Sequence, residues 1–401
     1  MKITIPLRAT GRAAAVLAIL VALAACDDNN NGIGPDVGSV TVSVTSTGAG
    51  VSSLGYLVTL DGGVGEPVAA NGDVSVSAAA GTHSVELTQV GSNCTVAGEN
   101  PRTVTVIAGE DAAVTFEVTC VARQIAFASD RSGSFAIYSL SEDGTGLTRL
   151  TNDAAPLFAI LPAWSPDGSR IAFSSSRQRS TVGLDIWVME ADGSGQERLT
   201  DSPGQNGGAA WSHDGTRIAF ASTRGSATGA TAEIWIMNAD GSNQVQLTND
   251  GAFANTPSWS PDDSKIVFQS NRDGNDQLYV MNADGSGIQR LTTGTSSDQA
   301  PSWSPDGALI AFHSDRDNTM AADSANFEVY VINADGSGSP VRLTDNASFD
   351  GRASWSPDGS EILFDTRRDG NQDVYVMKRD GSGQVNITRN AAGDGFARFQ
   401  P

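Results

Sequence analysis

The chain has 401 residues, enough for two or three domains, and it is rich in Gly, Ser, Thr, Asp and Val, a composition typical of short strands and turns. Its formal net charge of −21 argues against nucleic-acid binding, which needs a basic patch, and against adsorption to anionic lipid. The charge fits a soluble surface that attracts cations or a basic partner.

Residues 1–25 have the features of a lipoprotein signal peptide. Basic residues are followed by an apolar stretch from 13 to 25, which is too short to span a bilayer. Residues 23–26, Leu-Ala-Ala-Cys, resemble a bacterial lipobox, which implies cleavage before Cys26 and lipidation of that cysteine. An ordinary signal peptide with a coincidental cysteine is the alternative. Residues 26–37 are then expected to form a flexible tether.

The cysteine count supports this assignment. Three cysteines would leave one thiol unpaired in an exported chain. If Cys26 carries lipid, Cys94 and Cys120 remain as a pair in an oxidising compartment, where we expect a disulfide. Two free buried thiols are the alternative for that pair.

Residues 38–121 predict a small β-sandwich. Six runs with period-two alternation, such as residues 40–44 and 114–118, are separated by Gly-rich turns. The segment loosely resembles the immunoglobulin-like or carboxypeptidase-regulatory-like modules of bacterial surface lipoproteins. We interpret it as a spacer that holds the next domain off the membrane.

Residues 122–401 contain one recurring pattern of four segments. The first segment ends in the frame Trp-Ser-(Pro/His)-Asp-(Gly/Asp), at Trp164, Trp211, Trp259, Trp303 and Trp355. The others are an Ile-x-Phe run, a run such as Tyr-Val-Met, and Leu-Thr or Ile-Thr. Repeats of this length with several strands predict an all-β fold, a six-bladed propeller.

The sixth copy is split between the two ends of this segment. Phe399 begins it, and the rest lies upstream, from Arg123 to Thr151. We therefore expect the C-terminal strand to join the first blade beside the strand that begins at Ile125. This pairing would close the ring and remove two open sheet edges.

One turn recurs in most repeats, and a second turn and one arginine recur in all six; we interpret them as scaffold. Ser-Pro-Asp-Gly matches a type I turn, and Asp-Gly matches a two-residue hairpin. An arginine that follows the second strand is expected to pair with nearby carboxylates. The six arginines are Arg131, Arg177, Arg224, Arg272, Arg316 and Arg368.

The repeats differ on one rim, where we expect the binding residues. The loop from this arginine to the third strand spans 6, 9, 10, 6, 13 and 6 residues in chain order, whereas the turns on the opposite face are uniform. Asx residues precede the innermost strands on the variable rim and are expected to encircle the channel mouth. They are Asn206, Asn255, Asp298, Asp350 and Asp394.

This ring has more than one interpretation. The carboxylates of Asp298, Asp350 and Asp394 could hold Ca²⁺ or a cationic side chain. A set of solvated Asx turns is the alternative that we favour, so no cofactor is expected. Three nearby aromatic residues are candidate rim contacts for a partner: Phe158, Phe253 and Phe349.

The repeat resembles that of TolB-type propellers. Trp-Ser-Pro-Asp-Gly, Ile-Ala-Phe, Ser-x-Arg-Asp-Gly-Asn, Tyr-Val-Met and Asn-Ala-Asp-Gly-Ser recur in this order, most fully from Trp259 to Thr292. The resemblance implies a six-bladed periplasmic propeller that binds proteins, among them a peptidoglycan-associated lipoprotein. TolB carries an α/β domain where this chain has its sandwich, so the resemblance leaves open whether this chain acts in the Tol–Pal system.

A non-enzymatic function is expected. The three histidines, His83, His213 and His313, belong to no Ser-His-Asp set or metal-ligand spacing. We expect a monomeric, lipid-anchored envelope propeller that binds a protein or peptide through its variable rim and channel mouth. A carbohydrate or peptidoglycan binder, or a propeller-class enzyme such as a lyase or peptidase accessory, is the alternative. The choice between inner and outer membrane stays open.

Overall fold

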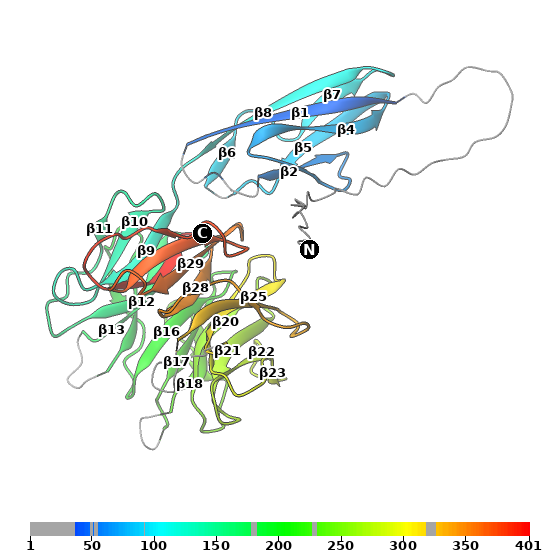
Figure 1. The fold of residues 1–401 in the computed structure, drawn as a ribbon. Coiled ribbons are helices and arrows are strands. Elements are labelled where there is room, and N and C mark those ends of the chain that lie inside the picture. Colours follow the sequence, from blue (N-terminus) through cyan, green and yellow to red (C-terminus); the bar gives the residue numbers. More distant parts are fainter. Residues whose placement is uncertain are drawn as a thin grey trace, which may run out of the picture.

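The computed structural model describes residues 37–48, 51, 55–91, 93–177, 183–226, 231–317 and 326–401. The regular elements of this part of the chain are strands, arranged in eight four-stranded sheets (Figure 1). Among these residues no helix is long and apolar enough to cross a membrane. The predicted signal peptide and Cys26 lie outside the described residues.

Two sheets, with the orders β4-β1-β8-β6 and β3-β2-β5-β7, form the N-terminal sandwich. Alternate residues of β1 and β8 face inward, so Val42 and Phe116 are buried in one core with Tyr56 and Val85 of the other sheet. The strands are β1 (Val37–Gly48), β2 (Tyr56–Leu60), β3 (Glu66–Val68), β4 (Asn71–Ala79), β5 (Gly81–Thr88), β6 (Cys94–Val96), β7 (Arg102–Val106) and β8 (Asp111–Cys120).

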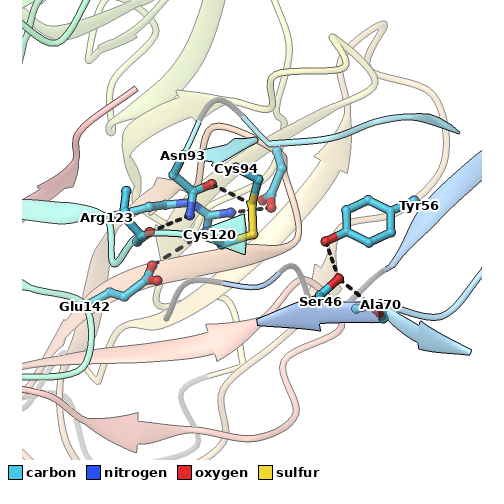
Figure 2. The surroundings of a disulfide bond; sticks show 10 residues. Ser46, Tyr56, Ala70, Asn93, Cys94, Cys120, Arg123 and Glu142 are labelled. Carbon is cyan, nitrogen blue, oxygen red and sulfur yellow. Dashed lines mark hydrogen bonds and ion pairs between the residues drawn. A yellow bond between two sulfur atoms is a disulfide. The ribbon is translucent and has the colours of Figure 1, made fainter. Parts of the chain in front are cut away.

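A disulfide lies at the end of the sandwich where the chain passes into the propeller (Figure 2). It joins Cys94 of the edge strand β6 to Cys120 of β8, with an S–S distance of 1.98 Å. The side-chain amide of Asn93 donates to the carbonyl of Val121 at 2.8 Å. The last residues before the propeller are therefore held to the sandwich by covalent and hydrogen bonds.

Arg123 fastens the start of the propeller to a distant blade. Its side chain is nearly fully buried, and its guanidinium lies 2.5 Å from Asp358 and 3.7 Å from both Glu142 and Glu361. Asp358 and Glu361 belong to the turn and strand of the blade that precedes the C-terminal strand. Burial raises the pKa of Glu142. The charge of Arg123 opposes this effect, and the neighbouring carboxylates of Glu361 and Asp358 add to it.

The remaining six sheets are formed by described residues from 124 to 399, and each has antiparallel neighbours. The innermost strands are β12 (Ala159–Trp164), β16 (Asn206–Trp211), β20 (Ala254–Trp259), β24 (Asp298–Trp303), β28 (Asp350–Trp355) and β32 (Asp394–Phe399). The second strands are β9 (Gln124–Ser129), β13 (Arg170–Ser175), β17 (Arg217–Ser222), β21 (Lys265–Ser270), β25 (Leu309–Ser314) and β29 (Glu361–Thr366).

The third strands are β10 (Ala136–Ser141), β14 (Asp185–Glu190), β18 (Glu233–Asn238), β22 (Gln277–Asn282), β26 (Glu328–Asn333) and β30 (Asp373–Lys378). The outer strands have two residues each: β11 (Thr148–Arg149), β15 (Glu197–Arg198), β19 (Val245–Gln246), β23 (Gln289–Arg290), β27 (Val341–Arg342) and β31 (Val385–Asn386). Such short outer strands offer little edge for pairing with another chain.

Neighbouring blades share cores and indole hydrogen bonds. The phenylalanine of the second strand is buried in all six sheets, for example Phe127 in β9 and Phe268 in β21. The indole N–H of Trp211 donates to the carbonyl of Ala163 in the preceding blade at 3.2 Å. Trp164, Trp259 and Trp355 make the same inter-blade contact, whereas Trp303 donates within its own turn.

The C-terminal strand pairs with β9, as predicted from Phe399. Phe399 lies opposite Ile125 in an antiparallel register. The indole of Trp164 donates to the carbonyl of Arg398 at 3.2 Å, which continues the inter-blade contact across the junction of the two chain ends. The first blade therefore combines segments from both ends of the propeller sequence.

The Ser-Pro-Asp-Gly motifs form turns held by their own side chains, as predicted. The Ser165 hydroxyl donates to Asp167 at 2.6 Å, and the Gly168 N–H donates to the Ser165 carbonyl at 2.9 Å. The hydrogen bond from Ser165, with help from the backbone of Ser169, lowers the pKa of Asp167 to about 2. These carboxylates serve the turns.

Candidate functional site

Four of the predicted channel-mouth residues are buried and engaged in contacts within their own blades. Asn206, Asp298, Asp350 and Asp394 are the first residues of β16, β24, β28 and β32, and each is 0% exposed. Each accepts from the arginine that follows the second strand of its own blade. The contacts are Arg224–Asn206 at 3.0 Å, Arg316–Asp298 at 2.7 Å, Arg368–Asp350 at 2.6 Å and Arg131–Asp394 at 2.9 Å.

The other two blades obtain the same pairing from a different position. Their inner strands begin with Ala159 and Ala254, whose methyl side chains cannot accept a hydrogen bond from a guanidinium. Arg177 pairs instead with Asp153 at 2.5 Å, and Arg272 pairs with Asp250 at 3.2 Å. Every one of the six arginines thus has an acceptor, which supports their interpretation as scaffold.

The predicted calcium ligands do not gather at one point. Asp298, Asp350 and Asp394 lie in three separate blades, and each already faces a guanidinium. Within the described part of the chain no group of three or more His, Cys, Asp and Glu residues could hold a metal ion. A buried carboxylate with its own cation is a structural element of the blade, which favours a scaffold role for these aspartates over the Ca²⁺ alternative.

The residue two positions further along each inner strand has a left-handed backbone. The φ angles are +57° at Leu161, +65° at Gly208, +49° at Thr256, +48° at Ala300, +56° at Arg352 and +59° at Phe396. The pairing of every inner strand with its second strand shifts register at this point. Such a bulge redirects a side chain, and it commonly lies next to a binding site.

Side chains of the preceding blade stabilise four of these bulges. The bulge N–H groups of Ala300 and Arg352 donate at 3.3 Å to Gln269 and to His313 Nδ1, respectively. Asp365 accepts from the bulge N–H of Phe396 at 3.0 Å, and Ser174 accepts from that of Gly208 at 3.2 Å. The strained conformation is therefore held by its surroundings, whichever side chain the bulge residue carries.

The six bulge residues line one cavity of about 480 Å³ at the centre of the ring. Leu161, Pro162 and Pro257 give part of its wall an apolar surface, and Gln299 and Asn255 add amides. Of the predicted aromatic contacts, Phe253 and Phe349 line this cavity, whereas Phe158 does not. The inner strands begin and the second strands end at this level, so the cavity opens toward the variable rim.

A second cavity, of about 310 Å³, adjoins the first. The two share Leu161, Gly208, Phe253 and Asn255, and the second continues outward past Leu184. We call the two together the channel trough. Two predicted channel-mouth residues line it: Asn255, at the second position of its strand, borders both cavities, and Asn206, at the first position of β16, borders the second cavity.

Two arginines form the cationic wall of the trough. Arg352 Nη1 lies 3.1 Å from Asp365 Oδ2, and its guanidinium lies 4.3 Å from the ring centroid of Phe396 and 5.4 Å from that of Phe349. Burial raises the pKa of Asp365, an effect that Arg352 opposes. Burial also lowers the pKa of the Arg398 guanidinium.

His313 is neutral in this wall. Burial, and secondarily the charge of Arg352, lowers its pKa to about 3. Its ring packs edge-on against Phe327 and Phe349, with centroids 5.2 and 5.6 Å away. Since its Nδ1 accepts the backbone N–H of Arg352, the histidine supports the bulge rather than carrying charge.

Comparison with known proteins gives a consistent result. The family model described as the TolB beta propeller domain matches residues 154–229 and 225–327. The Tol-Pal system protein TolB of Geobacter sulfurreducens is 41% identical over 75 residues, which are 19% of this chain and 16% of that protein. The crystal structure of TolB from Acinetobacter baumannii has a TM-score of 0.60 and 22% identity, covering 70% of this chain and 67% of that one.

The chain contains a TolB-like β-propeller.

The residues that the family model matches lie within the propeller. A putative TolB from Agrobacterium tumefaciens, with a TM-score of 0.52 and 20% identity, is covered over 99% of its length by 70% of this chain. The matched segment spans less than a fifth of the Geobacter protein. At these identities the solved structures establish the fold of the TolB-like propeller alone.

The two remaining histidines lie away from the trough of the TolB-like propeller. His83 belongs to the sandwich, where its Nδ1 lies 2.6 Å from Asp61, and that hydrogen bond raises the pKa of His83. His213 lies in a turn on the opposite face, 3.3 Å from Asp263. Neither is close to the residues that line the trough.

Sequence reasoning missed the bulge residues for a clear reason. Of the six, only Gly208 is a residue type that favours positive φ, so residue identity carries little signal. The available signal was positional: the third residue of the inner strand varies from Gly to Arg while the tryptophan three residues later recurs.

Proposed function

We propose that this chain is a non-enzymatic, lipid-anchored protein of the bacterial envelope that binds an extended segment of another protein in the channel trough. One observation carries the proposal. Six bulges repeat the same backbone conformation, yet their side chains differ in every blade and line one cavity. A repeated scaffold with a non-repeated lining is what specific recognition on a propeller requires.

The dimensions of the trough favour a chain segment as the ligand. Its two adjoining parts measure about 480 and 310 Å³ and lead from the centre of the ring past Leu184 to the rim. An elongated, mostly apolar path with a few polar groups suits an extended peptide. The names of the relatives support an envelope location, and a peptidoglycan-associated lipoprotein is one partner that the resemblance implies.

Site-specific cross-linking in intact cells tests this function. With p-benzoylphenylalanine in place of Thr256, we expect a discrete cross-linked product, because this residue lines the channel. The product is detected by immunoblotting against this chain and identified by mass spectrometry of the fractionated envelope.

The matched control carries the same photoreactive residue at Ser194, an exposed position in a turn on the opposite face. The proposal requires that the product form from position 256 and not from position 194. Equal products from both positions, or none from position 256 under several growth conditions, would count against binding in the trough.

Lipid anchoring, which the residues outside the described part would provide, is tested separately. We expect Cys26→Ser to stop incorporation of labelled palmitate and to move the protein from the membrane to the soluble fraction, because the acyl chains supply the membrane affinity. Cys94→Ser is the control, since it removes a cysteine without removing the lipidation site. Persistent labelling of the Cys26→Ser variant would show that the lipobox assignment is wrong.

A further inference from the structure

The ionisable groups of the channel trough have the sign opposite to that of the whole protein. The chain carries a formal charge of −21, yet the described residues that line the trough include Arg352 and Arg398 and neither aspartate nor glutamate. Asp365 is buried behind the lining and bonds to Arg352. Two guanidinium groups therefore face the trough with one carboxylate between them.

Both guanidinium groups have donors available. Arg352 donates from Nη1 to Asp365 at 3.1 Å, and its guanidinium packs over the ring of Phe396. Arg398 donates from Nη1 to the carbonyl of Ala397 at 2.8 Å, and no described carboxylate forms an ion pair with it. A guanidinium has five N–H donors, and the single carboxylate of Asp365 balances only one of the two cations, so this wall favours an anion.

The arginines lie across the ring from the point where the trough leaves the channel. Contacts between successive inner strands give the ring order β32, β12, β16, β20, β24, β28. Arg352 on β28 and Arg398 on β32 are neighbours, while Gly208 on β16 and Phe253 beside β20, which the second cavity shares, lie opposite. A segment that enters over Leu184 and Phe253 therefore points toward the two guanidinium groups.

We propose that the trough binds an extended peptide segment that bears an aspartate or glutamate side chain, whose carboxylate pairs with Arg352 and Arg398 while flanking apolar side chains contact Leu161, Leu184 and Phe253. This inference rests on the proposed function and specifies the chemistry of its ligand. Charge complementarity with the cationic wall selects the carboxylate.

A side-chain carboxylate fits better than a chain terminus. Terminal carboxylates are usually captured by nests of free backbone N–H groups. Here the bulge N–H groups of Ala300, Arg352 and Phe396 already donate to Gln269, His313 and Asp365. The charged donors that face the trough are therefore guanidinium groups, which bind carboxylates in the bidentate manner.

The test measures retention of two immobilised peptide libraries by the purified chain at low salt. Both are acetylated and amidated decapeptides with random flanking positions, and they differ only by Glu or Gln at the fixed fifth residue. We expect about tenfold greater retention on the Glu library, in keeping with a charge-assisted pair. Arg398→Gln should reduce the preference strongly, and Arg398→Lys should restore part of it.

Folding is kept separate from binding by the choice of variants. Arg352→Gln leaves Asp365 without its partner, so it is compared with the double variant Arg352→Gln/Asp365→Asn, which removes both members of the pair. Arg379→Gln is the matched control, because this arginine pairs with Asp306 on the opposite face. The control should keep the full preference, and the double variant should lose it while retaining the wild-type unfolding midpoint.

Three outcomes would overturn the inference. Equal retention of the Glu and Gln libraries would show that the trough does not recognise a side-chain carboxylate. If Arg398→Gln and the double variant keep the full preference for the Glu library, the carboxylate binds at another site on the protein. Retention on immobilised oligogalacturonate, without a preference for Glu peptides, assigns the wall to an acidic carbohydrate. In each case a cross-link from position 256 to a protein would still support the proposed function, so the two can fail independently.

Discussion

Removal of residues 394–401 is expected to unfold the propeller or to lower its free energy of unfolding by at least about 5 kcal/mol. The deletion takes away β32, and with it the buried Phe399, the acceptor of the Trp164 indole and the partner of Arg131. It also exposes the edge of β9, which becomes free to pair with other chains. Urea unfolding followed by tryptophan fluorescence, together with light scattering, measures both effects.

Gln400→Ala is the control for this deletion. The strand remains, and only the hydrogen bond from the Gln400 side chain to the carbonyl of Gly168 is lost. We expect a change of about 1 kcal/mol or less. A truncated chain that unfolds at the same urea concentration as the full chain would show that β32 does not stabilise the ring.

Arg316→Met should lower the free energy of unfolding by about 3 kcal/mol, because it leaves the carboxylate of Asp298 buried without a cation. Asp298 is fully buried, its Oδ1 lies 2.7 Å from Arg316, and methionine preserves packing between Phe312 and Tyr330. The double variant Arg316→Met/Asp298→Asn should regain most of the loss. Thermal and urea unfolding of both variants provide the measurement.

A surface pair supplies the comparison for this prediction. Arg290 lies 3.5 Å from Asp273, with half of the aspartate side chain exposed, so Arg290→Met should cost less than about 1 kcal/mol. If Arg316→Met and Arg290→Met are equally mild, the inner arginine pairs do not hold the blades. The residues that begin the inner strands would then be open again to a binding role.

Strand positions and ring closure were predictable because they depend on short-range patterns. The Trp-Ser-Pro-Asp-Gly frame marks where an inner strand ends and turns, and Phe399 in the place of the tryptophan predicts the pairing of β32 with β9. Hydrophobic alternation in residues 40–44 likewise predicts which side chains of β1 face the core.

The candidate site was less predictable because it depends on side-chain pairing and backbone conformation. Position in the sequence placed Asp298 near the channel, but it did not show that Arg316 already occupies its carboxylate. The two sets, arginines and Asx residues, were interpreted separately although they are partners. The bulges at Leu161 and Arg352 depend on support from a neighbouring blade, which no local pattern encodes.

The way these bulges are held has a consequence for the evolution of the propeller. A kink maintained by the neighbour, such as the one that Asp365 supports at Phe396, places few demands on the residue that occupies it. Four of the six positions around the cavity have such support, so they can accept substitutions with little effect on the bulge itself. The side chains that line the cavity can therefore change while the blades keep their fold. A few point mutations at these positions are then enough to change which ligand the propeller binds.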